Sequence, residues 1–235
     1  MKRFSIIILM LIVNSCHSQD KDKPSNKTTS NSKKNNIEIP INQKNMQTHT
    51  TEEFTEQEIQ KYKKNKTDGG YQYVDLNGSK ILETDDDFIL FRRDITPKYS
   101  LFTTNKEYHS NKKLWTKYET FGESGFIKGI RYEYDEKGKL IKAEDYDKPF
   151  KFTWEQVKKY IEQDLKLDLL KDDVNVNNYT GIEGGKPTWE INFKGKYKDI
   201  FGVYYITLDG ENGELLKVIK ILGRDGESRV IFEKK

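Results

Sequence analysis

Cys16 is the residue whose type and position point most clearly to chemistry, because a thiol can be acylated and this is the only cysteine in the 235-residue chain. It follows two basic residues, Lys2 and Arg3, and an apolar run over residues 6–13. That run is far shorter than the about 20 residues that a membrane-spanning helix needs. The pattern therefore predicts an export signal that is removed during maturation.

Val13, Ser15 and Cys16 occupy positions −3, −1 and +1 of the predicted cleavage site. This arrangement resembles the signal of bacterial lipoproteins, whose cysteine becomes the acylated first residue of the mature chain. The resemblance implies a palmitate-bearing lipoprotein of the bacterial cell envelope, held in the outer membrane by the lipid on Cys16. More than one acyl chain gives stable anchoring, at about 0.8 kcal/mol per buried methylene. The alternative is that Cys16 is an unmodified thiol next to an uncleaved segment.

The other reactive side chains form no recognisable catalytic pattern. His17 and His49 precede the expected folded part, and His109 has no second histidine at the spacing of metal ligands. Neither a Gly-x-Ser-x-Gly motif nor a phosphate-binding glycine loop is present. We therefore expect a protein that is not an enzyme and that uses no metal or cofactor. A glycosidase with two acidic residues stays open, because acids are abundant.

Two acidic segments could be taken for cation sites. Residues 85–87 are three consecutive aspartates, which point in diverging directions from an extended chain and favour a solvated turn. Residues 209–213 read Asp-Gly-Glu-Asn-Gly and lack the bidentate acid that a calcium loop carries at its twelfth position. We predict a turn in both places.

Tyrosine occurs 14 times and offers the candidate binding residues. On a sheet with one solvated face, exposed tyrosines can stack on a glycan or a protein partner. The candidates in predicted strands are Tyr71, Tyr73, Tyr132, Tyr134 and Tyr204. The alternative is that these rings fill the core and its margins.

The formal net charge of +3 arises outside the expected folded part. Residues 17–50 carry six lysines and three acids, whereas residues 51–235 carry 33 basic and 35 acidic side chains. The folded part is thus close to neutral, which excludes the basic footprint of a nucleic-acid-binding protein. Residues 17–50 are rich in Lys, Asn and Ser and too poor in apolar residues to fold, so they predict a disordered tether.

The rest of the chain favours strands joined by turns. A capping box at Thr50–Glu53 or Thr55–Glu58 predicts a short helix within residues 51–65. Alternation with a period of two and turn residues about every ten positions predict an antiparallel meander. We expect its strands at residues 71–74, 88–91, 99–102, 114–118, 126–130, 131–134 and 140–143, with a hairpin return near residue 81.

After Pro149 the pattern changes to a helix followed by strands. Thr153 and Gln156 form a capping box, and Trp154, Val157 and Ile161 share one helix face with Leu165. The following strands are expected from Val174, and at residues 189–193, 201–208, 214–222 and 229–232. The predicted organisation is a signal at 1–15, a lipidated tether at 16–50, a helix plus meander at 51–150 and an α+β domain at 151–235.

Two family resemblances accompany this pattern. The segment Tyr-Asp-Glu-Lys-Gly-Lys-Leu-Ile at residues 134–141 resembles the hairpin unit of MORN-variant and YD-type repeats. Residues 153–222 resemble a PepSY-like domain through Trp-x-Ile-x-Phe at 189–193, Tyr-x-Thr-x-Asp at 205–209 and the turn at 212–214. The PepSY-like resemblance implies an antiparallel sheet with one helix and a role in binding or inhibiting peptidases. The helix lacks that family's usual small residues, and a strand at 229–232 is additional.

We therefore expect an α+β protein, anchored in the membrane through Cys16, that binds an unidentified peptide or protein without catalysis. An immunity or antitoxin-like lipoprotein that neutralises a toxin is the alternative, as is a glycan-binding protein. The partner, the binding face, the membrane leaflet, the oligomeric state and the continuity of 51–150 with 151–235 stay open at this point.

Overall fold

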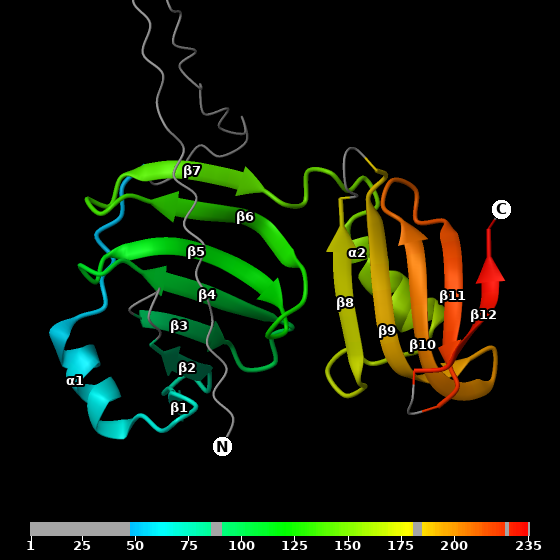
Figure 1. Cartoon of the computed structure of the whole chain (residues 1–235), viewed down its shortest axis with the longest axis horizontal. Coiled ribbons are helices and arrows are strands. Elements are labelled where there is room, and N and C mark those ends of the chain that lie inside the picture. The colour runs from blue at the N-terminus through cyan, green and yellow to red at the C-terminus, as the bar shows by residue number, and fades with distance from the viewer. Residues whose placement is uncertain (1–47, 86–90, 181–184, 224–225, 235) are drawn as a thin grey trace, which may run out of the picture. The chain divides into compact units, whose positions relative to one another are not determined.

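The computed structural model describes residues 48–85, 91–180, 185–223 and 226–234 (Figure 1). In this part of the chain two antiparallel sheets, of seven and five strands, are accompanied by two short helical segments. The broad prediction of an α+β fold is therefore confirmed, with strands dominating. The expected strand at residues 88–91 lies mostly outside the described residues.

The seven-stranded sheet is a meander in which each strand pairs with the next one along the chain. A capped helix, α1 (Glu56–Asn65), precedes it. The strands are β1 (Tyr71–Val74), β2 (Lys80–Thr84), β3 (Phe91–Thr96), β4 (Phe102–Tyr108), β5 (Leu114–Phe121), β6 (Ile127–Tyr134) and β7 (Leu140–Asp145).

The five-stranded sheet has the order β12-β11-β10-β9-β8 and is also a meander. The helix α2 (Trp154–Lys159) precedes it and continues as a π-helical turn over Tyr160–Asp164. The strands are β8 (Val174–Tyr179), β9 (Thr188–Tyr197), β10 (Ile200–Asp209), β11 (Leu215–Ile221) and β12 (Ser228–Glu233).

Helix α1 begins where the sequence predicts a capping box. The Thr55 hydroxyl and backbone N–H both donate to the Glu58 carboxylate, and the Glu58 N–H donates back to the Thr55 hydroxyl at 3.3 Å. The helix buries Ile59 and Tyr62, and Phe54 just before it stacks on Phe91 with ring centroids 4.5 Å apart. This small cluster covers one face of the seven-stranded sheet.

Two strand predictions in the first half are wrong in detail. Residues 99–102 were expected to be extended, but Tyr99 has a φ of 65° and the Ser100 N–H donates to the Pro97 carbonyl, so a turn precedes β4. Residues 127–134 form the single strand β6, where two strands at 126–130 and 131–134 were expected. Gly129, at a φ of 68°, lies where the register between β5 and β6 shifts, which explains the break in the sequence pattern.

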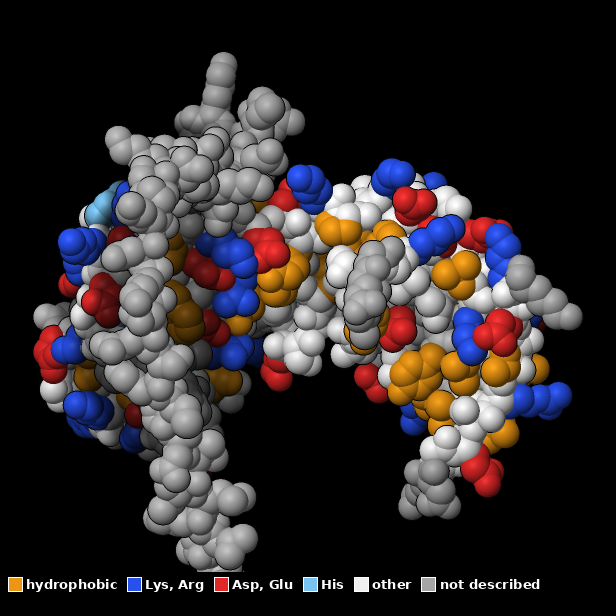
Figure 2. Space-filling view, turned by 45° about the horizontal axis from the view of Figure 1, so that its top comes forward, with side chains coloured by type: hydrophobic (Ala, Val, Ile, Leu, Met, Phe, Trp, Pro, Cys, Tyr) orange, Lys and Arg blue, Asp and Glu red, His pale blue; other side chains and the backbone are white. Residues whose placement is uncertain are grey.

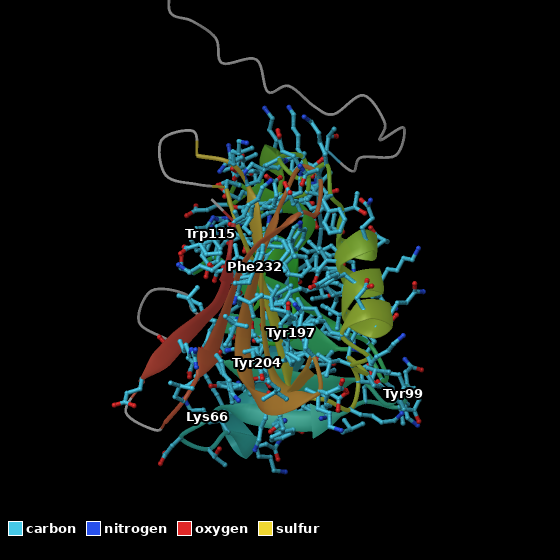
Figure 3. The ribbon with its side chains drawn as sticks, turned by 90° about the vertical axis from the view of Figure 1, so that its right-hand side faces the viewer. Lys66, Tyr99, Trp115, Tyr197, Tyr204 and Phe232 are labelled. Carbon is cyan, nitrogen blue, oxygen red and sulfur yellow. The ribbon has the colours of Figure 1, made fainter. Side chains whose placement is uncertain are left out.

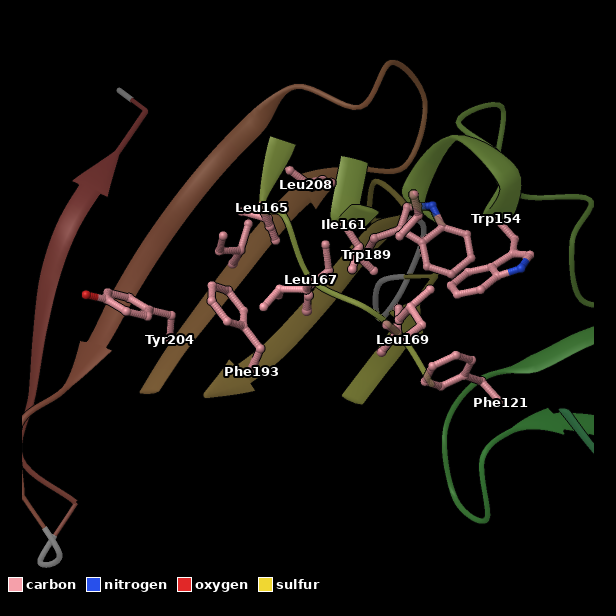
Figure 4. Packing of buried hydrophobic residues seen from close by; sticks show 14 of the residues in the cluster. Phe121, Trp154, Ile161, Leu165, Leu167, Leu169, Trp189, Phe193, Tyr204 and Leu208 are labelled. Atoms are coloured by element: carbon pink, nitrogen blue, oxygen red, sulfur yellow. The ribbon is translucent and has the colours of Figure 1, made fainter. Parts of the chain in front are cut away.

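The second core forms where α2 packs on one face of the five-stranded sheet (Figure 4). The predicted stripe of Trp154, Val157, Ile161 and Leu165 is buried as a whole. Leu167, just beyond the helix, joins the same cluster. The sheet contributes inward-facing side chains from four strands, namely Val176, Trp189, Ile191, Phe193, Tyr204, Ile206, Leu208 and Val218.

Aromatic residues from the seven-stranded sheet belong to this second core. Phe126 lies 5.2 Å from Trp154 and 5.0 Å from Trp189, measured between ring centroids, and Phe121 lies 5.1 Å from Trp154. The Phe126 N–H also donates to the Val176 carbonyl of β8 at 3.4 Å. The two sheets are therefore connected by a shared aromatic core, although none of their described strands pair with each other. None of the described helices is long and apolar enough to cross a membrane.

We predict that Phe126→Ala lowers the free energy of unfolding by about 3–5 kcal/mol, because it leaves a cavity between Trp154 and Trp189. Urea unfolding followed by tryptophan fluorescence measures this loss. Leu76→Ala is the control, because Leu76 is fully exposed and its truncation should change stability by less than about 0.5 kcal/mol. Equal effects of the two substitutions would contradict the shared core.

Candidate functional site

The five-stranded sheet has two faces, and α2 packs on only one of them (Figure 3). The buried side chains of β10, Tyr204, Ile206 and Leu208, face the helix, as does Val218 of β11. Because side chains alternate along a strand, the residues between them point to the opposite side. We call that opposite side the open face, since no described helix or strand packs on it.

The open face carries a contiguous set of apolar side chains instead of the polar ones expected on a solvated side. The register aligns Val203 with Ile221 and Tyr205 with Ile219, and Ile219 in turn with Val230. Figure 2 shows hydrophobic side chains gathered over this sheet. We call the set the apolar patch; its members are Phe201, Val203, Tyr205, Ile219, Ile221 and Val230.

The patch is accessible to solvent in the described chain. Phe201 is 61% exposed, Val230 is 48% exposed and Tyr205 is 40% exposed. Single exposed apolar residues are ordinary, but a contiguous patch bordered by polar residues marks an interaction surface. The arrangement suits the burial of a partner's apolar surface, which yields about 25 cal/mol per Å² removed from water.

Lysines border the patch on its β9 side. Lys196 is aligned with Phe201, and Lys194 with Val203. Both side chains are exposed, and no ion pair involves either of them in the described part of the chain. At the other end of the sheet Asn175 and Asn192 are aligned, so the open face becomes polar toward β8. The patch is thus apolar at its centre and positively charged on one border.

The structure assigns two of the predicted tyrosines to the core. Tyr204 is 1% exposed, packs against Phe193 and Tyr197, and donates its hydroxyl proton to the Ile200 carbonyl at 2.8 Å. Tyr134 is also buried, and its carbonyl accepts a hydrogen bond from Nε2 of His109. These two rings stabilise the fold and present no stacking surface.

Tyr71 and Tyr73 are half-buried at the β1 edge of the seven-stranded sheet, with ring centroids 4.7 Å apart. The Lys61 ammonium lies 4.2 Å from the Tyr73 centroid and 5.6 Å from that of Tyr71. The Tyr73 hydroxyl donates to the buried Glu83 carboxylate at 3.2 Å. This pair of rings is therefore already covered by a cation of the same chain.

Tyr132 is half-buried beside the first core, in β6, and is aligned with Ala143 of β7. The five predicted tyrosines thus lie in both sheets and do not converge on one surface. Cys16, the predicted lipidation residue, lies outside the described residues, as do Asp86 and Asp87.

The described residues of the two acidic segments form local hydrogen bonds. Asp85 accepts hydrogen bonds from the Tyr62 hydroxyl at 2.6 Å and from the Lys66 ammonium at 2.9 Å. Asp209 accepts from the backbone N–H groups of Glu211 and Asn212, which confirms the predicted turn between β10 and β11. Among the described residues, no group of three or more His, Cys, Asp or Glu side chains is placed to hold a metal ion.

A polar layer crosses the seven-stranded sheet on the face opposite α1. Arg92 donates to Asp94 and to the buried Asn105, whose amide in turn donates to Thr120. Burial raises the pKa of Asp94 above its ordinary value, although the hydrogen bond and charge of Arg92 oppose this shift. Next to them, Glu107 accepts from the hydroxyls of Thr116 and Tyr118. Because these polar side chains form hydrogen bonds with one another, their burial has a structural explanation and the layer is not a candidate site.

Sequence reasoning missed the apolar patch, although the sequence carries a signal for it. Residues 201–208 and 215–221 are apolar at both odd and even positions, a pattern typical of strands that are covered on both faces. Among the described helices only α2 packs on this sheet, and it covers one face. No protein-family model, no curated protein and no solved structure matches the chain, so the surface is interpreted from its own chemistry.

The contacts of Tyr73 lead to a prediction about alkaline pH. Burial and the neighbouring charge of Glu83 raise the pKa of Tyr73 to about 12 from 10.0. A raised pKa in the folded state means that protonated Tyr73 contributes stability in full below about pH 10, and that this contribution is lost as the pH rises through about 12.

Tyr73→Phe removes this titration, so we expect the free energy of unfolding of the variant to fall less steeply between pH 10 and 12. Urea unfolding at a series of pH values measures the difference. Tyr99→Phe is the matched control, since Tyr99 is 78% exposed. Parallel curves for wild type and Tyr73→Phe would show that the environment of Tyr73 is not as described.

Proposed function

We propose that this protein is a lipid-anchored lipoprotein of the bacterial cell envelope that binds a protein or peptide partner and catalyses no reaction. The observation that carries the binding role is the apolar patch on the open face of the five-stranded sheet. A folded protein that leaves Phe201, Tyr205 and Val230 exposed to water is stabilised when a partner covers them.

The chemistry of the patch specifies the partner in outline. The apolar side chains at its centre are cross-strand neighbours on one face of the sheet. Such a surface suits an apolar strand or sheet surface of the partner. Its border of Lys194 and Lys196 suits acidic groups beside that apolar surface. We therefore propose a partner that presents an apolar surface flanked by carboxylates.

The finer fold assignment is part of the same proposal. The order of one helix followed by antiparallel strands, with Trp189, Ile191 and Phe193 facing the helix, supports a PepSY-like arrangement of residues 153–222. Strand β12 follows the β10–β11 hairpin and adds a further strand to the edge of the sheet. A partner related to peptidases is in keeping with this resemblance.

The binding surface can be tested by photo-crosslinking in living cells. We expect a photoreactive phenylalanine analogue at position 205 to give one dominant crosslinked protein, and Lys194→Glu to reduce its yield several-fold. The matched control places the analogue at Asn175, which is exposed on the polar part of the same face. Equal, diffuse crosslinking from both positions would contradict a partner on the patch.

The anchor requires a separate experiment, because it concerns the export signal rather than the fold. We expect the wild-type chain to incorporate labelled palmitate and to sediment with membranes, and Cys16→Ser to lose the label. Cys16 is the only cysteine, so no second thiol can take its place. Equal palmitate incorporation by the variant would show that Cys16 is not the acylated residue.

A further inference from the structure

Strand β12 is the exposed edge of the five-stranded sheet. All six of its residues are exposed, and its centre is apolar, with Val230, Ile231 and Phe232. β12 pairs with β11 on one side and stands last in the strand order of its sheet. Edge strands with free N–H and C=O groups and apolar side chains are templates for pairing with another strand.

The other edges among the described strands are protected to a greater degree. On β8 the Val176 carbonyl accepts from the Phe126 N–H, and backbone hydrogen bonds from residues 48–50 cover the start of β7. β1 has only four residues. β12 is therefore the described edge that combines length, apolar character and exposure.

We propose that β12 pairs with β12 of a second copy of this chain, antiparallel and across a two-fold axis, so that two five-stranded sheets become one sheet. The proposal goes beyond the partner-binding role and does not depend on it. It rests on the alternation of side chains in β12 and on the charges at its two ends.

A bulge in β12 selects the register of this pairing. Val230 is aligned with Ile219 on the open face, whereas Phe232 is aligned with Val218 on the α2 face, so Ile231 is the extra residue between them. The register that places Val230 opposite Ile231 of the second copy also places Arg229 opposite Phe232 and Ser228 opposite Glu233. Both members of each of these last two pairs lie on the same face of the sheet.

The same register is complementary in charge. It places Glu227 opposite Lys234 of the second copy, and the two-fold axis makes this pair occur twice. No ion pair involves Glu227 within the described part of its own chain, whereas Lys234 contacts Glu214. A shift by one residue either puts Glu227 opposite Glu233 or pairs residues from opposite faces. The strand is therefore self-complementary in one register.

The pairing also has a consequence for the apolar patch. Because Val230 lies on the open face beside Ile219, the two patches would meet at the two-fold axis and form one continuous surface. A contact of two six-residue strands falls at the lower end of interface sizes, which predicts a reversible dimer in solution. A shared membrane anchor would raise the local concentration and favour the dimer.

Sedimentation of the full chain carrying Cys16→Ser, in mild detergent, tests the proposal. We expect a concentration-dependent dimer that predominates at about 100 µM, where a contact with a micromolar Kd is mostly occupied. Glu227→Lys or Lys234→Glu should each weaken it about tenfold, and the double variant Glu227→Lys with Lys234→Glu should restore it. Glu190→Lys is the control, since Glu190 lies on β9, away from the β12 edge.

A monomer at all concentrations would overturn the proposal, as would a dimer that the single charge reversals leave unchanged or that the double variant fails to restore. Circular dichroism of each variant shows that the fold is retained. Failure of the dimer with persistent crosslinking at position 205 would overturn this inference and leave the partner-binding function standing. A dimer in solution without a specific crosslink at position 205 would support the dimer and overturn the proposed partner-binding function.

Discussion

The packing of a single helix against a five-stranded sheet is the constraint on which the rest of this structure depends. Ile161 and Val157 are fully buried between α2 and the sheet, and aromatic residues of the first sheet complete that core. The second face of the sheet receives no such cover from the described chain. Apolar residues such as Tyr205 therefore remain exposed on that face, and the proposed binding role depends on them.

The aromatic core also explains why the two sheets form parts of one folded body. Phe126 contacts both Trp154 and Trp189, so the loop between β5 and β6 is part of the hydrophobic core of the second sheet. The seven-stranded sheet is otherwise stabilised by its own helix and by the satisfied polar layer of Arg92, Asp94 and Asn105. The exposed apolar surface described above lies on the second sheet.

The sequence predicted the parts of this fold that local chemistry determines. The capping boxes at Thr55 and Thr153 begin α1 and α2, and the stripe of Trp154, Val157 and Ile161 is buried as expected. Turn residues separated most strands correctly. The positions of β4 and β6 were less predictable, because residue periodicity reveals neither the left-handed turn at Tyr99 before β4 nor the register shift between β5 and β6 near Gly129.

The candidate site was less accessible to sequence reasoning, for a physical reason. Tyr204 and Tyr205 are adjacent, yet one is buried against Phe193 and the other is exposed, because alternation assigns them to opposite faces of β10. The sequence shows that the faces differ, but only the position of α2 shows which of them is covered. Composition alone therefore favoured tyrosines as candidate binding residues. The structure instead makes a mixed apolar surface that includes Ile219 and Val203 the candidate site.

Thiol labelling of the open face in the intact envelope tests the central claim most directly. Under the proposed acylation of Cys16, the cysteine introduced by Phe201→Cys is the free thiol; it should react readily in the purified protein and be protected in cells, where the proposed partner covers it. Asn175→Cys, on the polar part of the same face, should react equally in both settings. Equal labelling of Phe201→Cys in cells and in the purified protein would contradict a bound partner on this surface.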